Sequence, residues 1–229
     1  MTGNSARMLF YERFASRFDQ EMNRHEMEKR IKLVFERLLG DSLVGKRVLD
    51  AGCGTGWFSQ RAMAAGADVV SVDVGPNLLA EVRRKCPSRC VQGSVMTLGL
   101  AANTFDVVLC SEVIEHTPHP RQAVSELARV LRPGGALILT VPNHAWHFAV
   151  TLANLFRLRP YQGLENWVGC FELRRWLKES RLKIERQFGF NILPLKFPWT
   201  YSFIDYFDRF GRALGPMMVN IAVKAVKSP

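Results

Sequence analysis

The chain of 229 residues carries 31 Lys and Arg against 21 Asp and Glu, which gives a formal net charge of +10. Its length suits a single domain over residues 1–229 with a sizeable core, and no apolar run reaches the ~18 residues of a membrane-spanning helix. The five cysteines form no Cys-x-x-Cys pair and residues 1–7 lack the apolar core of a secretory signal, so we expect a cytoplasmic protein with reduced thiols and no bound metal.

Residues 1–143 begin with two predicted amphipathic helices, over 11–17 and 26–39, in which apolar side chains recur at helical spacing. Short apolar strands then alternate with helices. The expected strands are 47–50, 69–72, 90–92, 107–111 and 136–141, and the helices between them are 56–64, 76–84 and 120–131. This alternation favours an α/β fold in which helices cover both faces of a parallel sheet.

Residues 144–229 continue with helices over 146–156 and 171–179 and strands over 182–188 and 217–226. The segment 191–215 holds seven aromatic residues, and from Trp199 onward their spacing predicts one apolar helical face. Such a face must pack in the core, cover a substrate pocket or contact a bilayer. The whole region holds 13 Lys and Arg against 6 Asp and Glu. This excess is either a solvated surface or an attraction for an anionic substrate or an acidic membrane.

The most informative motif begins at Asp50, after which Gly52, Gly54 and Gly56 alternate with small residues. Glycine permits the sharp turn from a strand into a helix and leaves bare backbone against which a ligand can lie. A second acid, Asp73, closes the next strand, where a doubly wound fold binds the two hydroxyls of a ribose. The pattern therefore predicts a site for a nucleoside cofactor.

The run Asp50-Ala51-Gly52-Cys53-Gly54-Thr55-Gly56 resembles the first motif of the class I S-adenosylmethionine-dependent methyltransferases. Three further stretches follow in that family's order, namely Asp73, residues 105–116 and residues 131–135. The resemblance covers residues 47–143 and is closest to the small-molecule branch that includes the ubiquinone-pathway O-methyltransferases. It implies a doubly wound, mostly parallel seven-stranded sheet with an antiparallel last strand.

The same resemblance implies a site for S-adenosylmethionine and its product S-adenosylhomocysteine. Asp50 would hold the glycine loop or meet the methionine ammonium, and Asp73 would bind the ribose. Ser94 would face the adenine with a weaker hydrogen bond than the acid that many relatives carry there. In relatives an N-terminal helix closes over the cofactor, so residues 1–40 are interpreted as a lid, residues 41–143 as the cofactor-binding core and residues 144–229 as substrate-shaping segments. The expected cofactor-binding residues are Asp50, Gly52, Cys53, Gly54, Gly56, Asp73, Val74, Ser94, Val95, Ser111, Glu112 and Tyr11.

Two histidines are candidate catalytic residues. His116 follows the fourth strand, and its neutral imidazole could accept a proton from a hydroxyl or amine that attacks the methyl group. A structural role stays open for His116, because the Glu-His pair recurs in similar sequences with very different substrates. His144, with His147 nearby, follows the fifth strand and is either a base or the polar end of a surface helix. As an alternative to both catalytic roles, Glu112, Glu115 and His116 could together bind a divalent ion.

The leading functional hypothesis is methyl transfer from S-adenosylmethionine to a small-molecule or lipid-like acceptor, at a hydroxyl oxygen. Methylation of RNA or protein is an alternative that the basic charge permits, although no RNA-binding module is recognisable. An NAD-dependent oxidoreductase is a third hypothesis, but such enzymes space their glycines G-x-G-x-x-G. We therefore expect a small or amphipathic acceptor, no nucleic-acid partner, and a peripheral membrane contact as a further option.

Overall fold

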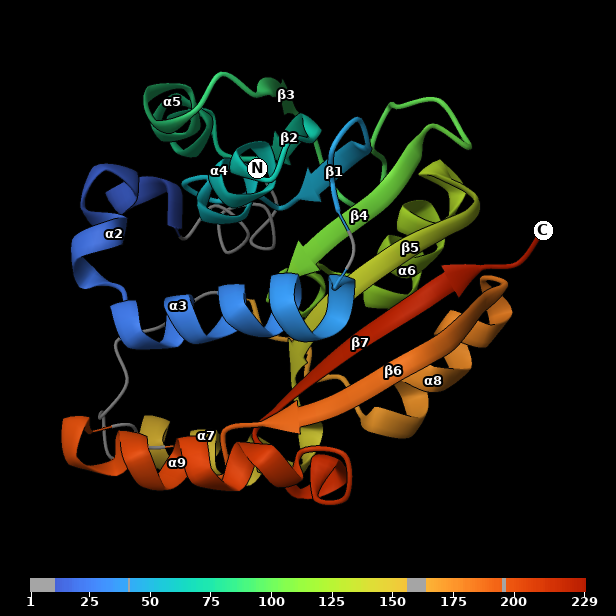
Figure 1. The fold of residues 1–229 in the computed structure, drawn as a ribbon. Helices are drawn as coiled ribbons and strands as arrows, with labels where there is room; N and C mark the ends of the chain where they lie inside the picture. Colours follow the sequence, from blue (N-terminus) through green and yellow to red (C-terminus); the bar gives the residue numbers. More distant parts are fainter. Residues whose placement is uncertain (1–10, 41, 156–163, 195–196) are drawn as a thin grey trace.

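A computed structural model describes residues 11–40, 42–155, 164–194 and 197–229. Seven strands form one sheet in the order β3-β2-β1-β4-β5-β7-β6 (Figure 1). They are β1 (Arg47–Ala51), β2 (Asp68–Asp73), β3 (Arg89–Gln92), β4 (Phe105–Ser111), β5 (Leu131–Pro142), β6 (Leu182–Phe190) and β7 (Asn220–Lys227). Strands β1 to β5 are parallel, whereas β7 is antiparallel to both β5 and β6. The predicted fold is therefore confirmed, including the antiparallel last strand.

Helices cover both faces of this sheet. The main helices are α2 (Phe18–Glu21), α3 (Arg24–Lys32), α4 (Trp57–Ala64), α5 (Pro76–Lys85), α6 (Pro120–Val130), α7 (His147–Leu155), α8 (Cys170–Glu179) and α9 (Tyr201–Phe207). Shorter 3-10 segments include η1 (Tyr11–Arg17), η3 (Ile114–His116), η4 (His144–Trp146) and η7 (Gly215–Met217), and α3 continues as the π-helix η2 (Leu33–Leu39). No helix within the described residues is both long and apolar enough to cross a membrane.

Each face of the sheet has its own apolar cluster. On one face, Met27 and Leu38 of the α3–η2 segment pack with Phe58 of α4 against β1, β2 and β4. On the other face, α6 and α8 pack against the same sheet, with Leu127 and Trp176 in the cluster. Figure 1 shows the α3–η2 segment crossing one side of the sheet while α6 and α8 lie beyond it. The α3–η2 segment is therefore part of the core as well as of the expected lid.

Several element boundaries differ from the predictions, and three of the differences have a clear cause or form. Strand β5 starts at Leu131, because Leu131 pairs with Phe105 and a shift of register before Val107 accommodates the Pro-Gly turn expected there. Strand β7 starts only at Asn220, because Pro216 directs residues 215–217 into a 3-10 turn. The helix predicted over 26–39 starts at residue 24 and becomes a π-helix for its last seven residues.

The carboxyl ends of β1, β4 and β5 meet at one edge of the sheet. Because β7 is antiparallel, its first residue lies at this edge too, and Asn220 pairs with Pro142 of β5 and with Phe190 of β6. Functional groups that follow the parallel strands and groups that begin β7 are thereby collected at one edge, which is where open α/β sheets bind their ligands.

Candidate functional site

The glycine loop turns from β1 into α4 with left-handed backbone at Gly52, Gly54 and Gly56, whose φ angles are 75°, 52° and 88°. The backbone N–H groups of Gly52 and Cys53 both donate to the carbonyl of Val72, at 2.8 and 3.0 Å. A Cβ on Gly52 would overlap the side chain of Val113, whereas one on Gly54 would meet nothing within 4 Å. The loop is therefore packed on one side and presents bare backbone on the other, as a cofactor cradle requires.

Asp73 holds the glycine loop from the end of β2. Its Oδ2 accepts the N–H of Gly54 at 2.9 Å and its Oδ1 accepts the N–H of Gly75 at 3.0 Å. The carboxyl is buried, and burial raises its pKa in spite of these hydrogen bonds. Asp73 therefore stands where a ribose acceptor is expected and also fixes the loop itself, a second role that the sequence pattern did not indicate.

Asp50 lies at the end of a chain of three hydroxyls, of which those of Ser59 and Ser71 are buried. Ser59 donates to Asp50 Oδ2 at 2.6 Å, the hydroxyls of Ser59 and Ser71 lie 2.7 Å apart, and Ser71 donates to Ser88 at 2.8 Å. Burial raises the pKa of Asp50 to about 7. Sequence reasoning missed the three serines because each comes from a different element.

Replacement of Asp50 by asparagine should change how stability depends on pH. The carboxyl ionises near its usual value of 3.8 when unfolded but near 7 when folded, so between these values only the folded state holds the proton. This contribution to the free energy of unfolding is largest at low pH and declines as pH rises, at up to about 1.4 kcal/mol per pH unit. Urea unfolding across this range should show the Asp50→Asn curve lacking that decline. Glu28→Gln, at an exposed site, should show the same decline as the wild type. If the free energy of unfolding of Asp50→Asn declined with pH in parallel with that of the wild type, the raised pKa assigned to Asp50 would be wrong.

Other expected cofactor residues surround the loop. Val74 accepts the Gln92 side chain through its carbonyl, and the Ser94 hydroxyl accepts the N–H of Met96 at 3.2 Å. Ser111 shares a 2.8 Å hydrogen bond with Thr140 of β5. Val95 and Cys53 are buried, burial raises the pKa of the Cys53 thiol, and the side chain of Tyr11 lies outside the described residues. Their cofactor contacts stay predictions.

Two carboxylates that the sequence analysis did not select attach the N-terminal segment to this site. Asp19 of α2 accepts hydrogen bonds from Thr55 at 2.6 Å and Trp57 at 2.9 Å and forms an ion pair with Lys85. Burial opposes ionisation of Asp19, but these contacts prevail and lower its pKa. Glu12 of η1 accepts the first free N–H groups of α5, from Asn77 at 2.9 Å. Such tertiary contacts carry no local sequence signal.

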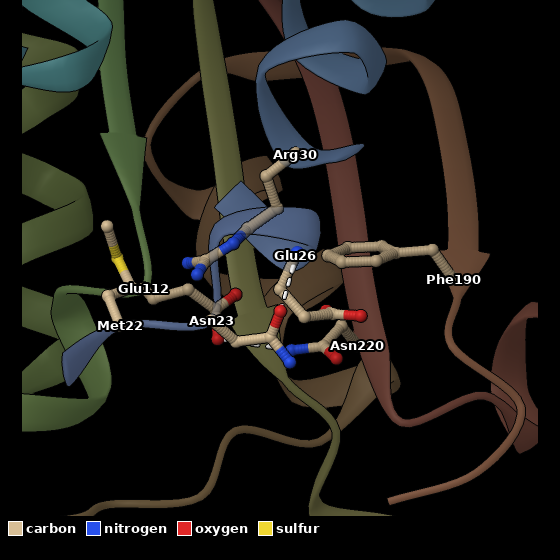
Figure 2. A pocket seen from close by; sticks show the side chains of 7 residues that line it. All are labelled: Met22, Asn23, Glu26, Arg30, Glu112, Phe190 and Asn220. Atoms are coloured by element: carbon tan, nitrogen blue, oxygen red, sulfur yellow. Dashed lines mark hydrogen bonds between the residues drawn. The ribbon is translucent and has the colours of Figure 1, made fainter. Parts of the chain in front are cut away.

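A cavity of about 240 Å³ lies at the edge of the sheet where β4 ends and β7 begins (Figure 2). Residues of α3, of the segment after β4 and of the ends of β6 and β7 form its walls. They are Met22, Asn23, Glu26, Arg30, Glu112, Phe190 and Asn220. The Glu112 side chain therefore faces this cavity, while its backbone N–H donates to the Thr140 carbonyl at 2.9 Å.

The Asn191 side chain makes hydrogen bonds with the polar residues that form one wall of the cavity. It is fully buried, accepts a hydrogen bond from Lys29 at 2.9 Å, and donates to Glu26 at 2.9 Å and to Asn220 at 3.2 Å. Lys29 also forms ion pairs with Asp205 of α9 at 2.8 Å and with Asp208 at 2.6 Å. Asn191 thus joins α3, β7 and the segment after β6 at one point.

The candidate histidines lie outside this cavity. His116 donates through Nδ1 to the carbonyl of Leu164 at 2.8 Å, and its Nε2 lies 3.9 Å from Glu115. Burial, and next the charge of Glu112, raise the pKa of Glu115 well above its usual value. His144 and His147 are exposed and stack at 5.7 Å. Within the described residues, no three His, Cys, Asp or Glu side chains are grouped so that they could hold a metal ion.

The predicted aromatic helical face exists in α9 and its flanks, but it is not in the core. Trp199, Phe203, Tyr206 and Phe210 are between 46% and 81% exposed, and the buried position of the helix is Ile204. None of these four aromatic residues lines the cavity. Of the three hypotheses for this face, core packing is therefore wrong for these four rings, whereas the cover of a substrate pocket and the contact with a bilayer stay predictions.

Known proteins share both the sequence pattern and the fold. A family model described as a methyltransferase domain matches residues 49–139. A ubiquinone biosynthesis O-methyltransferase of Xanthomonas oryzae pv. oryzae is 34% identical over 164 residues, covering 66% of this chain and 69% of the relative. Magnesium protoporphyrin IX methyltransferase from Synechocystis PCC 6803, solved with bound S-adenosylhomocysteine, matches with a TM-score of 0.70 at 20% identity over 98% of this chain and 99% of that one.

A third match is the methyltransferase of Haloferax volcanii that was solved in complex with the activator Trm112. It has a TM-score of 0.68 at 19% identity and covers 96% of each chain. The glycine loop with its bare backbone and the buried Asp73 at the end of β2 fit the cofactor of these proteins. By its sequence, fold and glycine loop, the chain belongs to the class I S-adenosylmethionine-dependent methyltransferases.

Proposed function

We propose that the protein methylates a hydroxyl oxygen of a small or amphipathic molecule. The observation that carries this proposal is the cavity lined by Glu112, the residue before the Val113 that contacts Gly52; its volume of about 240 Å³ suits a small molecule or a single head group. Its walls carry carboxylate, amide and guanidinium groups, which can orient a polar acceptor. When bound, S-adenosylmethionine supplies an activated methyl group, so the protein has only to align the acceptor with it.

Relatives support a small acceptor over a macromolecule. Their names describe O-methylation in ubiquinone biosynthesis, a reaction on a small molecule. An RNA or protein substrate would instead need an open surface groove that leads to the glycine loop. The cytoplasmic location that the composition indicates stays a prediction.

The exposed aromatic face of α9 supports an acceptor that partitions into lipid. Trp199, Phe203 and Tyr206 offer rings of the kind that enter a membrane interface, and Arg209 and Arg212 flank them with positive charge. We propose that this face rests on an anionic bilayer, so that an amphipathic acceptor is collected from its surface. Sedimentation with phosphatidylglycerol vesicles should deplete the wild type but not a variant with serine at positions 199, 203 and 206.

Methyl transfer can be tested with labelled S-adenosylmethionine and a fractionated cell extract. We expect label in the water-soluble or lipid-soluble small molecules, and we expect mass spectrometry of the labelled product to locate the methyl group on oxygen. Asp73→Ala serves as the control because it should lose the cofactor. Label that appears only in RNA or protein would contradict the proposed acceptor class while leaving the methyltransferase assignment intact.

A further inference from the structure

Two features distinguish Glu112, namely its backbone conformation and the hydrogen bonding of its two carboxylate oxygens. Its φ angle is 56°, the left-handed region that a glutamate rarely adopts, and such strain is most often retained at functional sites. Its Oε2 accepts a hydrogen bond from Asn220 at 3.1 Å. Its Oε1 is buried and accepts no hydrogen bond from any described residue. A buried carboxylate oxygen without a donor is costly, so a ligand donor is its natural partner.

Glu112 lies between the two halves of the site, which are the glycine loop and the cavity. The next residue, Val113, packs against Gly52 so closely that a Cβ there would overlap it, and the Glu112 side chain lines the cavity on the other side. Figure 2 shows Glu112 extending into the cavity from the segment after β4, with Phe190 among the other walls. Two adjacent residues thus connect the glycine loop to the cavity, Val113 by its contact with Gly52 and Glu112 by lining the cavity.

The remaining charges of the cavity favour a neutral ligand. Arg30 of α3 is half-buried, and its guanidinium forms no hydrogen bond or ion pair with the described residues. Against this one cation stand two carboxylates, Glu26 and Glu112. Burial, and next the charge of Glu112, raise the pKa of the neighbouring Glu115 well above its usual value. A further negative charge on the ligand would be repelled.

We propose that Glu112 accepts the proton of the acceptor's attacked hydroxyl, and that the cavity binds an uncharged hydroxylated molecule in preference to an anionic one. Arg30 donates to a second, neutral oxygen of the same molecule, and Phe190 and Met22 give an apolar wall for its carbon skeleton. This proposal rests on the proposed methyl transfer to oxygen. It replaces the anionic acceptor that the basic charge of residues 144–229 suggested.

The proton and electrons balance without any further reactant. The hydroxyl oxygen forms a bond to the methyl carbon with its own electron pair, and the pair of the carbon–sulfur bond stays on sulfur, which becomes a neutral thioether. The hydroxyl proton moves to the Glu112 carboxylate and from there to water. One positive charge thus leaves the sulfonium and appears as the released proton.

Two probes of matched shape test the selection by charge. 3-Hydroxybenzamide and 3-hydroxybenzoate are each titrated by calorimetry into the full chain loaded with S-adenosylhomocysteine, at neutral pH. We expect the amide to bind at least about tenfold more tightly than the acid, a difference of about 1.4 kcal/mol. Equal binding of the two, tighter binding of the acid, or no binding of either probe would overturn the proposed selection.

Variants of Glu112 and Arg30 separate the roles of these two side chains. Glu112→Gln should keep binding of the amide within about threefold, reduce the preference over the acid, and lower turnover of the acceptor found in the transfer assay by about 10²-fold or more. Arg30→Gln should weaken binding of both probes, and the exposed Arg24→Gln on the same helix should change neither. The pH dependence of turnover gives a second readout. Turnover of the wild type should fall toward low pH, and this fall should be absent in Glu112→Gln.

Unchanged turnover and pH profile in Glu112→Gln would overturn its role as proton acceptor, even though transfer to a hydroxyl continued. Failure to label any hydroxyl acceptor would instead reject the proposed function. Binding of S-adenosylhomocysteine by each variant, measured first, shows that the variant is folded and that the cofactor loop is intact. The two failures are therefore distinguishable.

Discussion

Replacing Asp73 with alanine is expected to weaken binding of S-adenosylhomocysteine by about 10²-fold or more. The change leaves the N–H groups of Gly54 and Gly75 without their acceptor, at about 1–3 kcal/mol for each buried group. It also removes the carboxylate proposed to accept the ribose hydroxyls, at about 1.5–3 kcal/mol for each charge-assisted bond. Because every 1.4 kcal/mol is a tenfold change in affinity, even part of this loss gives the expected effect.

Calorimetric titration checks this result, with thermal unfolding to measure the loss of stability in the same variant. Asp68→Asn is the matched control, because Asp68 begins the same strand but is exposed and pairs with Arg89 at the opposite edge of the sheet. It should bind the cofactor as the wild type does. An Asp73→Ala variant that binds within about threefold of the wild type would contradict the role assigned to this carboxylate.

Replacing Asn191 with alanine is expected to lower the free energy of unfolding by about 3–5 kcal/mol. The change removes the hydrogen bonds that this buried side chain makes with Lys29, Glu26 and Asn220, at about 1–3 kcal/mol for each bond that nothing replaces. It also puts alanine at a φ of 62°, which costs roughly 1–2 kcal/mol more. Urea unfolding followed by tryptophan fluorescence measures the sum.

Asn191→Gly separates the two causes. Glycine loses the same hydrogen bonds but tolerates the left-handed backbone, so the difference between the two variants reports the backbone strain alone. We expect glycine to be the more stable of the two by roughly 1 kcal/mol. If Asn191→Ala lost less than about 1 kcal/mol, the hydrogen bonds of this side chain would be replaceable by water and the polar wall would not depend on it.

The parts of the site that are local in sequence were predictable, and those that depend on distant partners were not. The glycine loop and Asp73 follow from the turn that joins a strand to a helix, so a few adjacent residues determine them. Asn191 was missed because its partners on α3 lie more than 160 residues earlier in the chain. Asp19 was missed for the same reason, since Thr55 and Trp57 come from the other side of β1.

Spacing predicted the aromatic face of α9 but could not say what it contacts. Periodicity reports that apolar groups share one side of a helix, whereas burial depends on what the rest of the chain places there. In the structure the ion pairs of Asp205 and Asp208 with Lys29 orient α9 so that Ile204 points inward and the rings point out. For Glu112, spacing identified the position after β4, but the left-handed backbone directs its side chain into the cavity.

One continuous stretch of chain, from η1 to the end of α3, touches both halves of the site. Glu12 and Asp19 hold it to the elements around the glycine loop, while Glu26 and Arg30 line the cavity. The cofactor and the proposed acceptor would therefore share a single structural element, and the ligand that orders this element would lower the entropic cost of binding the other. Because coupling between two sites is reciprocal, we expect each ligand to raise the affinity of the other by the same factor.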